Sequence, residues 1–190
     1  MLIRALGSLM ASAIVFTAAC GGSGTPSGPP CSVENVRGTV PGVTISIFAD
    51  KCVFAPGEKA QFRYEVTTTA DVPALATVAS QSCGSCRRAS GNPESWIHWI
   101  IDGRGPSGQS IHYCLCDTGC CPPDEAASFH VDAKTSRGVI DWSGHAWDGP
   151  SDTNQPQGDS FPPGDYNVEV TFDAPPTGAV TASLPIRVVD

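Results

Sequence analysis

The feature that most constrains this chain is a strict alternation of apolar and polar residues near its C-terminal end. After the turn residues Pro162-Pro163-Gly164, the apolar Tyr166, Val168, Val170 and Phe172 alternate with Asn167, Glu169 and Thr171. A period of two places alternate side chains on opposite faces of a strand. We therefore expect a strand with its apolar residues in a core and its polar residues in water. An extended, tryptophan-rich run at 141–149 precedes it, and a polar loop joins the two.

The same two-residue period recurs along the chain from Cys31 onward. It is clear at 43–47 and 62–66, with turn chemistry at Ala55-Pro56-Gly57-Glu58 between them. No run shows the helical period, and 20 Gly and 17 Pro supply turns. We therefore predict an all-β fold, an antiparallel sandwich, in which Pro185 marks an edge or a bulge. Further candidate strands lie at 75–79, 96–101, 110–116, 128–132, 139–142 and 179–189.

The first nineteen residues have the make-up of a secretory signal sequence. Arg4 supplies an early positive charge, an apolar run follows at 9–16, and small residues at 17–19 precede Cys20. The apolar run is shorter than the roughly 20 residues that span a bilayer. We interpret residues 1–19 as a signal peptide that is removed on export.

The end of this segment resembles the lipobox of bacterial lipoproteins. Phe16-Thr17-Ala18-Ala19 leads into Cys20-Gly21-Gly22, with Thr17 where the family usually has leucine. The resemblance implies that Cys20 becomes the lipid-modified first residue of the mature protein and fastens it to a membrane. Gly21 after the cysteine favours the outer membrane.

The mature chain is expected to be a tethered, acidic domain. Residues 21–30 contain only Gly, Ser, Thr and Pro, so we interpret 20–30 as the lipidated cysteine with a flexible tether of about 17 Å reach. Residues 31–190 then form one globular domain. Removal of 1–19 takes away one positive charge and changes the formal net charge from -8 to -9. An acidic domain with no basic run longer than Arg87-Arg88 repels nucleic acid, so we expect no nucleic-acid partner.

Cysteines are the second strong signal, because nine are present and one is taken by the lipobox. An even number outside the cytoplasm predicts up to four disulfides, in any of about 105 pairings. Neighbouring cysteines pair poorly, since the Cα atoms of a disulfide are usually about 5.5 Å apart. We expect Cys31 to pair with Cys52, and the other six to join the loop at 80–88 to the segment at 114–121. The eight disulfide candidates are Cys31, Cys52, Cys83, Cys86, Cys114, Cys116, Cys120 and Cys121.

Two other kinds of chemistry could use the same cysteines. Cys83-Gly84-Ser85-Cys86 has the spacing of a redox pair, and with Cys114 and Cys116 it could form a zinc site. No strand-then-helix context surrounds the pair, the second pair has the wrong spacing for a zinc ribbon, and oxidation competes with metal outside the cytoplasm. We favour disulfides over both.

The remaining chemistry-bearing residues give weaker candidates. The four histidines fall in candidate strands without the spacing of a ligand pair: His98, His112, His130 and His145. Gly158-Asp159-Ser160 lacks the spacing of a nucleophile elbow. The loop oxygens that could bind calcium do not follow the regular twelve-residue pattern: Asp148, Asp152, Asn154, Asp159 and Asp165. We assign no catalytic residue, no metal ligand and no cofactor.

Tryptophans offer a possible ligand groove. The chain has four: Trp96, Trp99, Trp142 and Trp147. In a strand, Trp96 and Trp99 would lie on opposite faces, so we expect one in the core and the other exposed or beneath the disulfides.

Four segments together carry a family resemblance. They are Thr44-Ile45-Ser46-Ile47; Phe54-Ala55-Pro56-Gly57-Glu58 leading into Phe62-Arg63-Tyr64-Glu65-Val66; Trp99-Ile100-Ile101-Asp102-Gly103; and Trp147-Asp148-Gly149 followed by Pro163-Gly164-Asp165-Tyr166-Asn167-Val168. Residues 43–172 thereby resemble the immunoglobulin-like domain of the bacterial intracellular proteinase inhibitor family, and the last segment is also similar to flagellar hook-capping proteins. Both families imply an immunoglobulin-like β-sandwich and neither implies catalysis. Export, the cysteine clusters and the insertion at 114–123 depart from the inhibitor family, and no inhibitory residue can be matched.

These observations favour a non-catalytic lipoprotein of the cell envelope whose disulfide-stapled sandwich binds a protein or another envelope component. The expected partners are the membrane, through the lipid anchor, and that component. A proteinase inhibitor acting outside the cytoplasm is the alternative, with the loops at 114–123 and 149–162 as its contact surface. A metal-dependent enzyme using cysteines or histidines is a second alternative.

Overall fold

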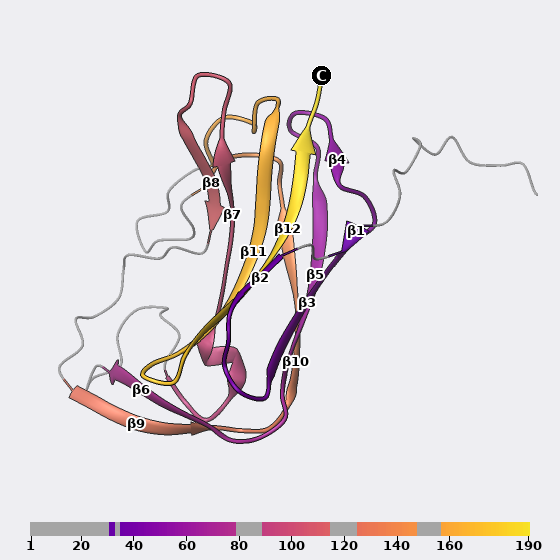
Figure 1. Cartoon of the computed structure of the whole chain (residues 1–190). Helices are drawn as coiled ribbons and strands as arrows, with labels where there is room; N and C mark the ends of the chain where they lie inside the picture. Colours follow the sequence, from indigo (N-terminus) through magenta and orange to yellow (C-terminus); the bar gives the residue numbers. More distant parts are fainter. Residues whose placement is uncertain (1–30, 33–34, 79–88, 115–124, 148–156) are drawn as a thin grey trace, which may run out of the picture.

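The chain is built of strands (Figure 1). The computed structural model describes residues 31–32, 35–78, 89–114, 125–147 and 157–190, so the signal sequence and tether expected at 1–30 lie outside the described residues. The described part contains no helix of the length and apolar character needed to cross a membrane. Its elements are β1 (Cys31–Ser32), β2 (Asn35–Gly38), β3 (Val43–Ala49), β4 (Val53–Phe54), β5 (Ala60–Thr68), β6 (Val72–Val78), the 3₁₀ helix η1 (Pro93–Trp96), β7 (Ile97–Arg104), β8 (Ser110–Cys114), β9 (Glu125–Val131), β10 (Thr135–Trp142), β11 (Gly164–Ala174) and β12 (Gly178–Val188).

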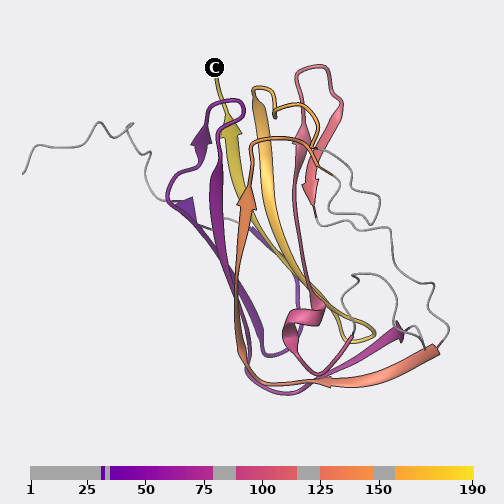
Figure 2. The same ribbon diagram turned by 180° about the vertical axis from the view of Figure 1, so that it is seen from behind.

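Two sheets face each other as an antiparallel, immunoglobulin-like sandwich, as expected (Figures 1 and 2). The four-stranded sheet has the order β1-β3-β5-β10, and the six-stranded sheet has the order β2-β12-β11-β7-β8 with β4 joined to β12. Among the named strands of the described residues, β4 with β12 is the one parallel pair. A two-stranded β6–β9 ribbon completes the fold.

The alternation read from the sequence sets the inner face of the six-stranded sheet. Tyr166, Val168, Val170 and Phe172 of β11 are at most 1% exposed. On β12, five alternate residues are buried: Val180, Ala182, Leu184, Ile186 and Val188. Each large apolar side chain removed from water contributes about 1.5 to 3 kcal/mol, so these two strands supply a large share of the core.

A tyrosine corner introduces β11. The Tyr166 hydroxyl donates a 2.8 Å hydrogen bond to the carbonyl of Pro162, four residues upstream. The Tyr166 ring packs against Phe161, with ring centroids 4.8 Å apart. A tyrosine near the start of a strand that bonds back to its own approach loop is a hallmark of immunoglobulin-like sandwiches. The Pro-Gly-x-Tyr segment therefore forms the corner through which the chain enters β11.

The β6–β9 ribbon continues the β5–β10 pair past a bend, as Figures 1 and 2 show at the end opposite the C-terminus. Thr135 pairs with Thr67 in the first ladder, and Val72 pairs with Val131 in the second. Phe129 of the ribbon packs edge-on against Trp96, with centroids 5.7 Å apart. The ribbon is thus fastened to the sandwich at its base.

The run at 141–149 is shorter as a strand than predicted. β10 starts earlier, at Thr135, and ends at Trp142. β10 and β11 also lie in opposite sheets, so they frame the core from both sides instead of pairing with each other.

Trp96 is also placed differently from the prediction. It ends η1, where Asn92 caps the first turn, and its indole nitrogen donates to the Ser90 carbonyl at 2.8 Å. Trp96 is buried in the core, while Trp99 is half-buried and stacks on Tyr113. A strand pattern could not show that Trp96 belongs to a short helix and Trp99 to the strand that follows it.

Pro185 lies in a local gap along β12. The outer side of β12 pairs with β2 up to Ser183 and with β4 from Arg187. Proline has no amide hydrogen to give a neighbouring strand, so it fits where no neighbour pairs. The expectation of an edge position is met locally, although β12 as a whole lies inside the sheet.

Candidate functional site

An open hollow of about 570 Å³ lies where β3 and β10 end and β5 begins. Its apolar part is formed by Phe54 and Trp142, which are 3% and 2% exposed. Their rings meet edge to face with centroids 5.5 Å apart. Because both rings are packed into the core, the floor of the hollow is preformed.

A tight turn shapes one wall of the hollow. The amide of Glu58 donates to the carbonyl of Ala55 at 3.0 Å, and Gly57 has φ +72°. Proline at the second position and a positive-φ glycine at the third are the signature of a type II turn. The turn predicted from Ala55-Pro56-Gly57-Glu58 is therefore confirmed.

The turn fixes a lysine at the mouth of the hollow. Lys51 forms an ion pair with Glu58, and its ammonium nitrogen lies 5.2 Å from the centre of the Phe54 ring. Burial alone would raise the pKa of Glu58. The hydrogen bonds from Lys51 and from the Ala55 amide, together with the charge of Lys51, outweigh burial and lower this pKa.

The opposite wall is held by Asp141, at the end of β10. Its carbonyl accepts a 2.6 Å hydrogen bond from the Tyr113 hydroxyl, and its carboxylate accepts a 2.7 Å bond from the Gln61 amide. Burial, and secondarily the charge of Asp141, raise the pKa of Tyr113. The bond from Tyr113 joins β8 of one sheet to β10 of the other, so it closes this side of the sandwich.

The pKa shifts of Glu58 and Tyr113 do not suit either group to proton transfer near neutral pH. A general acid or base works best with a pKa near the operating pH. The pKa of Glu58 is lowered and that of Tyr113 is raised, so both move away from neutrality. Both groups therefore hold fixed protonation states at neutral pH and act as structural parts of the walls.

The rim of the hollow is charged. Asp50 pairs with Arg63 at 2.7 Å, and both side chains are mostly exposed. Lys59 is exposed, and the described residues include no acid that pairs with it. A positive group is therefore available to a ligand beside an apolar floor. The sequence drew no attention to Lys51, Lys59 or Tyr113, although the lysines flank the recognisable Pro-Gly turn.

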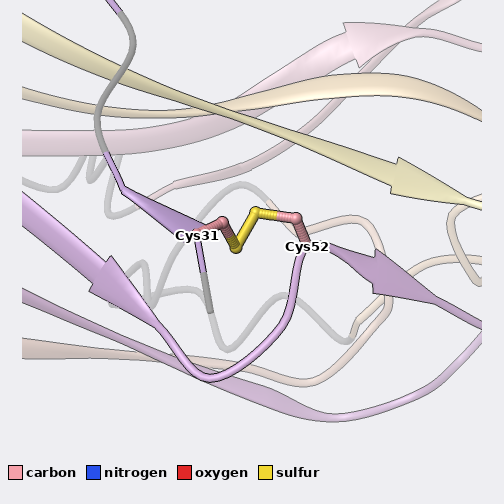
Figure 3. The surroundings of a disulfide bond; sticks show 2 residues. All are labelled: Cys31 and Cys52. Atoms are coloured by element: carbon pink, nitrogen blue, oxygen red, sulfur yellow. A yellow bond between two sulfur atoms is a disulfide. The ribbon is translucent and has the colours of Figure 1, made fainter. Parts of the chain in front are cut away.

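The disulfide between Cys31 and Cys52 is confirmed (Figure 3). Their Cα atoms are 5.9 Å apart, and Cys31 is also the register partner of Ala49, which lines the hollow. Cys114 is disulfide-bonded and 1% exposed. The other cysteines named above lie outside the described residues: Cys20, Cys83, Cys86, Cys116, Cys120 and Cys121.

The strand register bears on the two cysteine-rich segments. Val78 at the end of β6 pairs with Glu125 at the start of β9. The described chain therefore leaves β6 and enters β9 at the same end of the ribbon, and the cysteines at 79–88 and 115–124 lie outside the described residues. Their pairing stays a prediction.

The other candidate residues are dispersed. His98, His112 and His130 lie on β7, β8 and β9, and His145 follows β10. No group of three metal-binding side chains occurs among the residues that the structure describes. Of the loop oxygens considered for calcium, Asp165 pairs with Arg187, and those at 148–156 lie outside the described residues.

His145 and Ser160 are close in the fold without forming a catalytic pair. They are partners in an isolated bridge, and the His145 ring interacts with the carbonyl of Gly158 at 3.1 Å. Within the described ranges, no hydrogen bond joins the His145 ring to the Ser160 hydroxyl.

No protein-family model and no curated protein matches the chain.

Proposed function

We propose that the protein is an exported lipoprotein, held on a membrane through Cys20, whose sandwich binds a protein of the cell envelope at the hollow. The preformed apolar floor with its fixed, charged rim carries this proposal. Such a site accepts an apolar side chain on Phe54 and Trp142 while Lys59 receives a nearby carboxylate. A hollow of about 570 Å³ is within the size range of ligand sites, roughly 300 to 1,000 Å³.

The position of the hollow supports a partner near the membrane. The chain enters the fold at Cys31, which pairs with Ala49 at the lining of the hollow. A tether of about 17 Å reach would keep this end of the domain close to the lipid. Oxidised cysteines suit a compartment outside the cytoplasm.

Site-specific photocrosslinking in the native cells tests the binding site. A photoreactive residue in place of Lys59 should give an adduct with an envelope protein, whereas the same residue in place of Thr44 on the outer face of β3 should not. Adducts at both positions, or at neither, would contradict the assignment. Recovery of a protease in the specific adduct would instead favour an inhibitor.

Fractionation tests the anchor separately. Cys20→Ser should move the protein from the membrane fraction to the soluble exported fraction. The intact mass of the extracted protein, with and without reductant, should show acyl chains on Cys20 and four disulfides. An unmodified Cys20 would refute the lipoprotein part while leaving the hollow to be tested by crosslinking.

A further inference from the structure

We infer that a second copy of this chain pairs with β10, edge to edge and antiparallel, around a twofold axis at Val139. β10 is the last strand of the four-stranded sheet, and among the described residues it pairs only with β5. Its ladder with β5 runs through eight consecutive pairs without a bulge. Exposed edges are usually blunted by proline, bulges, short length or charged side chains. β10 has no proline and no bulge, and its exposed charges are one of each sign, Arg137 and Asp141.

The hydrogen-bonding pattern shows which backbone groups face the open edge. Lys134 accepts from the amide of Thr68, so even-numbered positions point toward β5. The carbonyl of Asp141 instead accepts from Tyr113, which places odd-numbered positions on the other side. In an antiparallel ladder this alternation is regular. The amides and carbonyls of Thr135, Arg137 and Val139, and the amide of Asp141, are therefore directed to the open edge, while the Asp141 carbonyl keeps its bond to Tyr113.

The sequence of β10 is self-complementary about Val139. In an antiparallel pair centred there, Arg137 of one copy lies opposite Asp141 of the other, twice in the dimer, and Val139 lies opposite its own copy. All three are edge-directed residues, so Val139 would exchange both backbone hydrogen bonds with its copy, and the amide of Asp141 would donate to the Arg137 carbonyl of the other copy. Their side chains share the outer face, where Arg137 and Val139 are exposed. Opposite charges directly across a ladder are favourable.

Other registers lose this match. A pair centred on residue 138 sets Arg137 opposite Val139, and one centred on residue 140 sets Asp141 opposite Val139. A pair centred on Arg137 sets two arginines face to face, which is unfavourable. The register at Val139 is therefore the one that the charges select.

The position of the tether leaves this edge available. Cys31 lies in β1, at the opposite edge of the same sheet. The chain segment preceding Cys31 therefore does not compete with a second copy for β10. A contact of one strand pair is small, so we expect a weak dimer that forms at high local concentration.

Sedimentation velocity of the oxidised full chain carrying Cys20→Ser tests the pairing, over about 10 µM to 1 mM. The chain should shift from monomer to dimer as its concentration rises. Arg137→Asp or Asp141→Arg should each raise the dissociation constant about thirtyfold, because two attractive pairs per dimer become repulsive. A control is Arg187→Asp, an exposed arginine of β12 in the other sheet, which should leave the dissociation constant unchanged.

Mixing the two charge variants separates a register effect from misfolding. Arg137→Asp and Asp141→Arg chains are complementary to each other, so an equimolar mixture should regain the dimer. Val139→Pro removes an edge-directed amide without taking a bond from β5, and it should abolish the dimer while circular dichroism stays unchanged. An unaltered chain that stays monomeric, charge variants that dimerise normally, or a mixture that stays monomeric would overturn the proposal.

Discussion

The tyrosine corner allows a sharp test of how the loop before β11 is held. Tyr166→Phe removes the 2.8 Å hydrogen bond to the Pro162 carbonyl and keeps the ring that packs against Phe161. No cavity forms, so the loss should be that of one hydrogen bond, about 1 to 1.5 kcal/mol of unfolding free energy. Tyr166→Ala, which also empties the ring's place in the core, should cost about 3 to 5 kcal/mol.

The same substitution should change the alkaline limb of stability. Burial raises the pKa of Tyr166, so its pKa in the folded chain exceeds its value near 10 in the unfolded chain. The contribution is therefore complete below about pH 10 and is lost as the pH rises through the folded value. Tyr166→Phe cannot ionise, so its stability should fall less steeply than that of the unaltered chain above about pH 10.

Guanidinium unfolding of the oxidised chain, followed by tryptophan fluorescence from neutral to alkaline pH, measures both effects. The slope against denaturant should stay constant, which shows that the folded and unfolded states are otherwise alike. A Tyr166→Phe chain as stable as the unaltered one, or as unstable as Tyr166→Ala, would refute the assigned role of the hydroxyl.

Three further outcomes are expected. Replacement of Cys31 and Cys52 together by serine should lower the unfolding free energy by about 3 kcal/mol, because the disulfide closes a loop with a sequence separation of 21. Denaturant titration measures this loss, and a loss under about 1 kcal/mol would contradict the loop estimate. Gly138→Ala should destabilise by about 1 to 3 kcal/mol, since a Cβ there would lie 2.2 Å from the Tyr64 ring; an unchanged melting temperature argues against this contact. Glu58→Gln should lower the unfolding free energy by at most about 1 kcal/mol at pH 7, as expected of a partly exposed ion pair. The difference from the unaltered chain should vanish as the pH falls below the lowered pKa of Glu58. A constant difference in thermal stability down to pH 2 would contradict the ion-pair account.

The sandwich could be predicted because strand alternation and turn chemistry are local. Tyr166 to Phe172 reads as one buried face, and Pro56-Gly57 reads as a turn, without knowledge of any neighbour. The pairing of Cys31 with Cys52 was accessible through spacing and the strain of the other pairs.

The candidate site could not be predicted, because it depends on which strand ends meet in space. Lys51 and Phe54 are close in the sequence but Trp142 comes from a distant part of the chain, and the hollow exists only once β3, β5 and β10 are side by side. Short pairings were missed for the same reason. β4 has two residues, and it is a strand only because β12 runs beside it.

The disulfide at the start of the fold also has a mechanical consequence. Tension on the chain preceding Cys31 would otherwise fall on β1, a two-residue strand that could peel from β3. The covalent bond passes that tension to Cys52, whose carbonyl accepts from the amide of Arg187 in β12. Force entering at one sheet is thus shared with the other, and the domain resists being unravelled from the end that begins at Cys31.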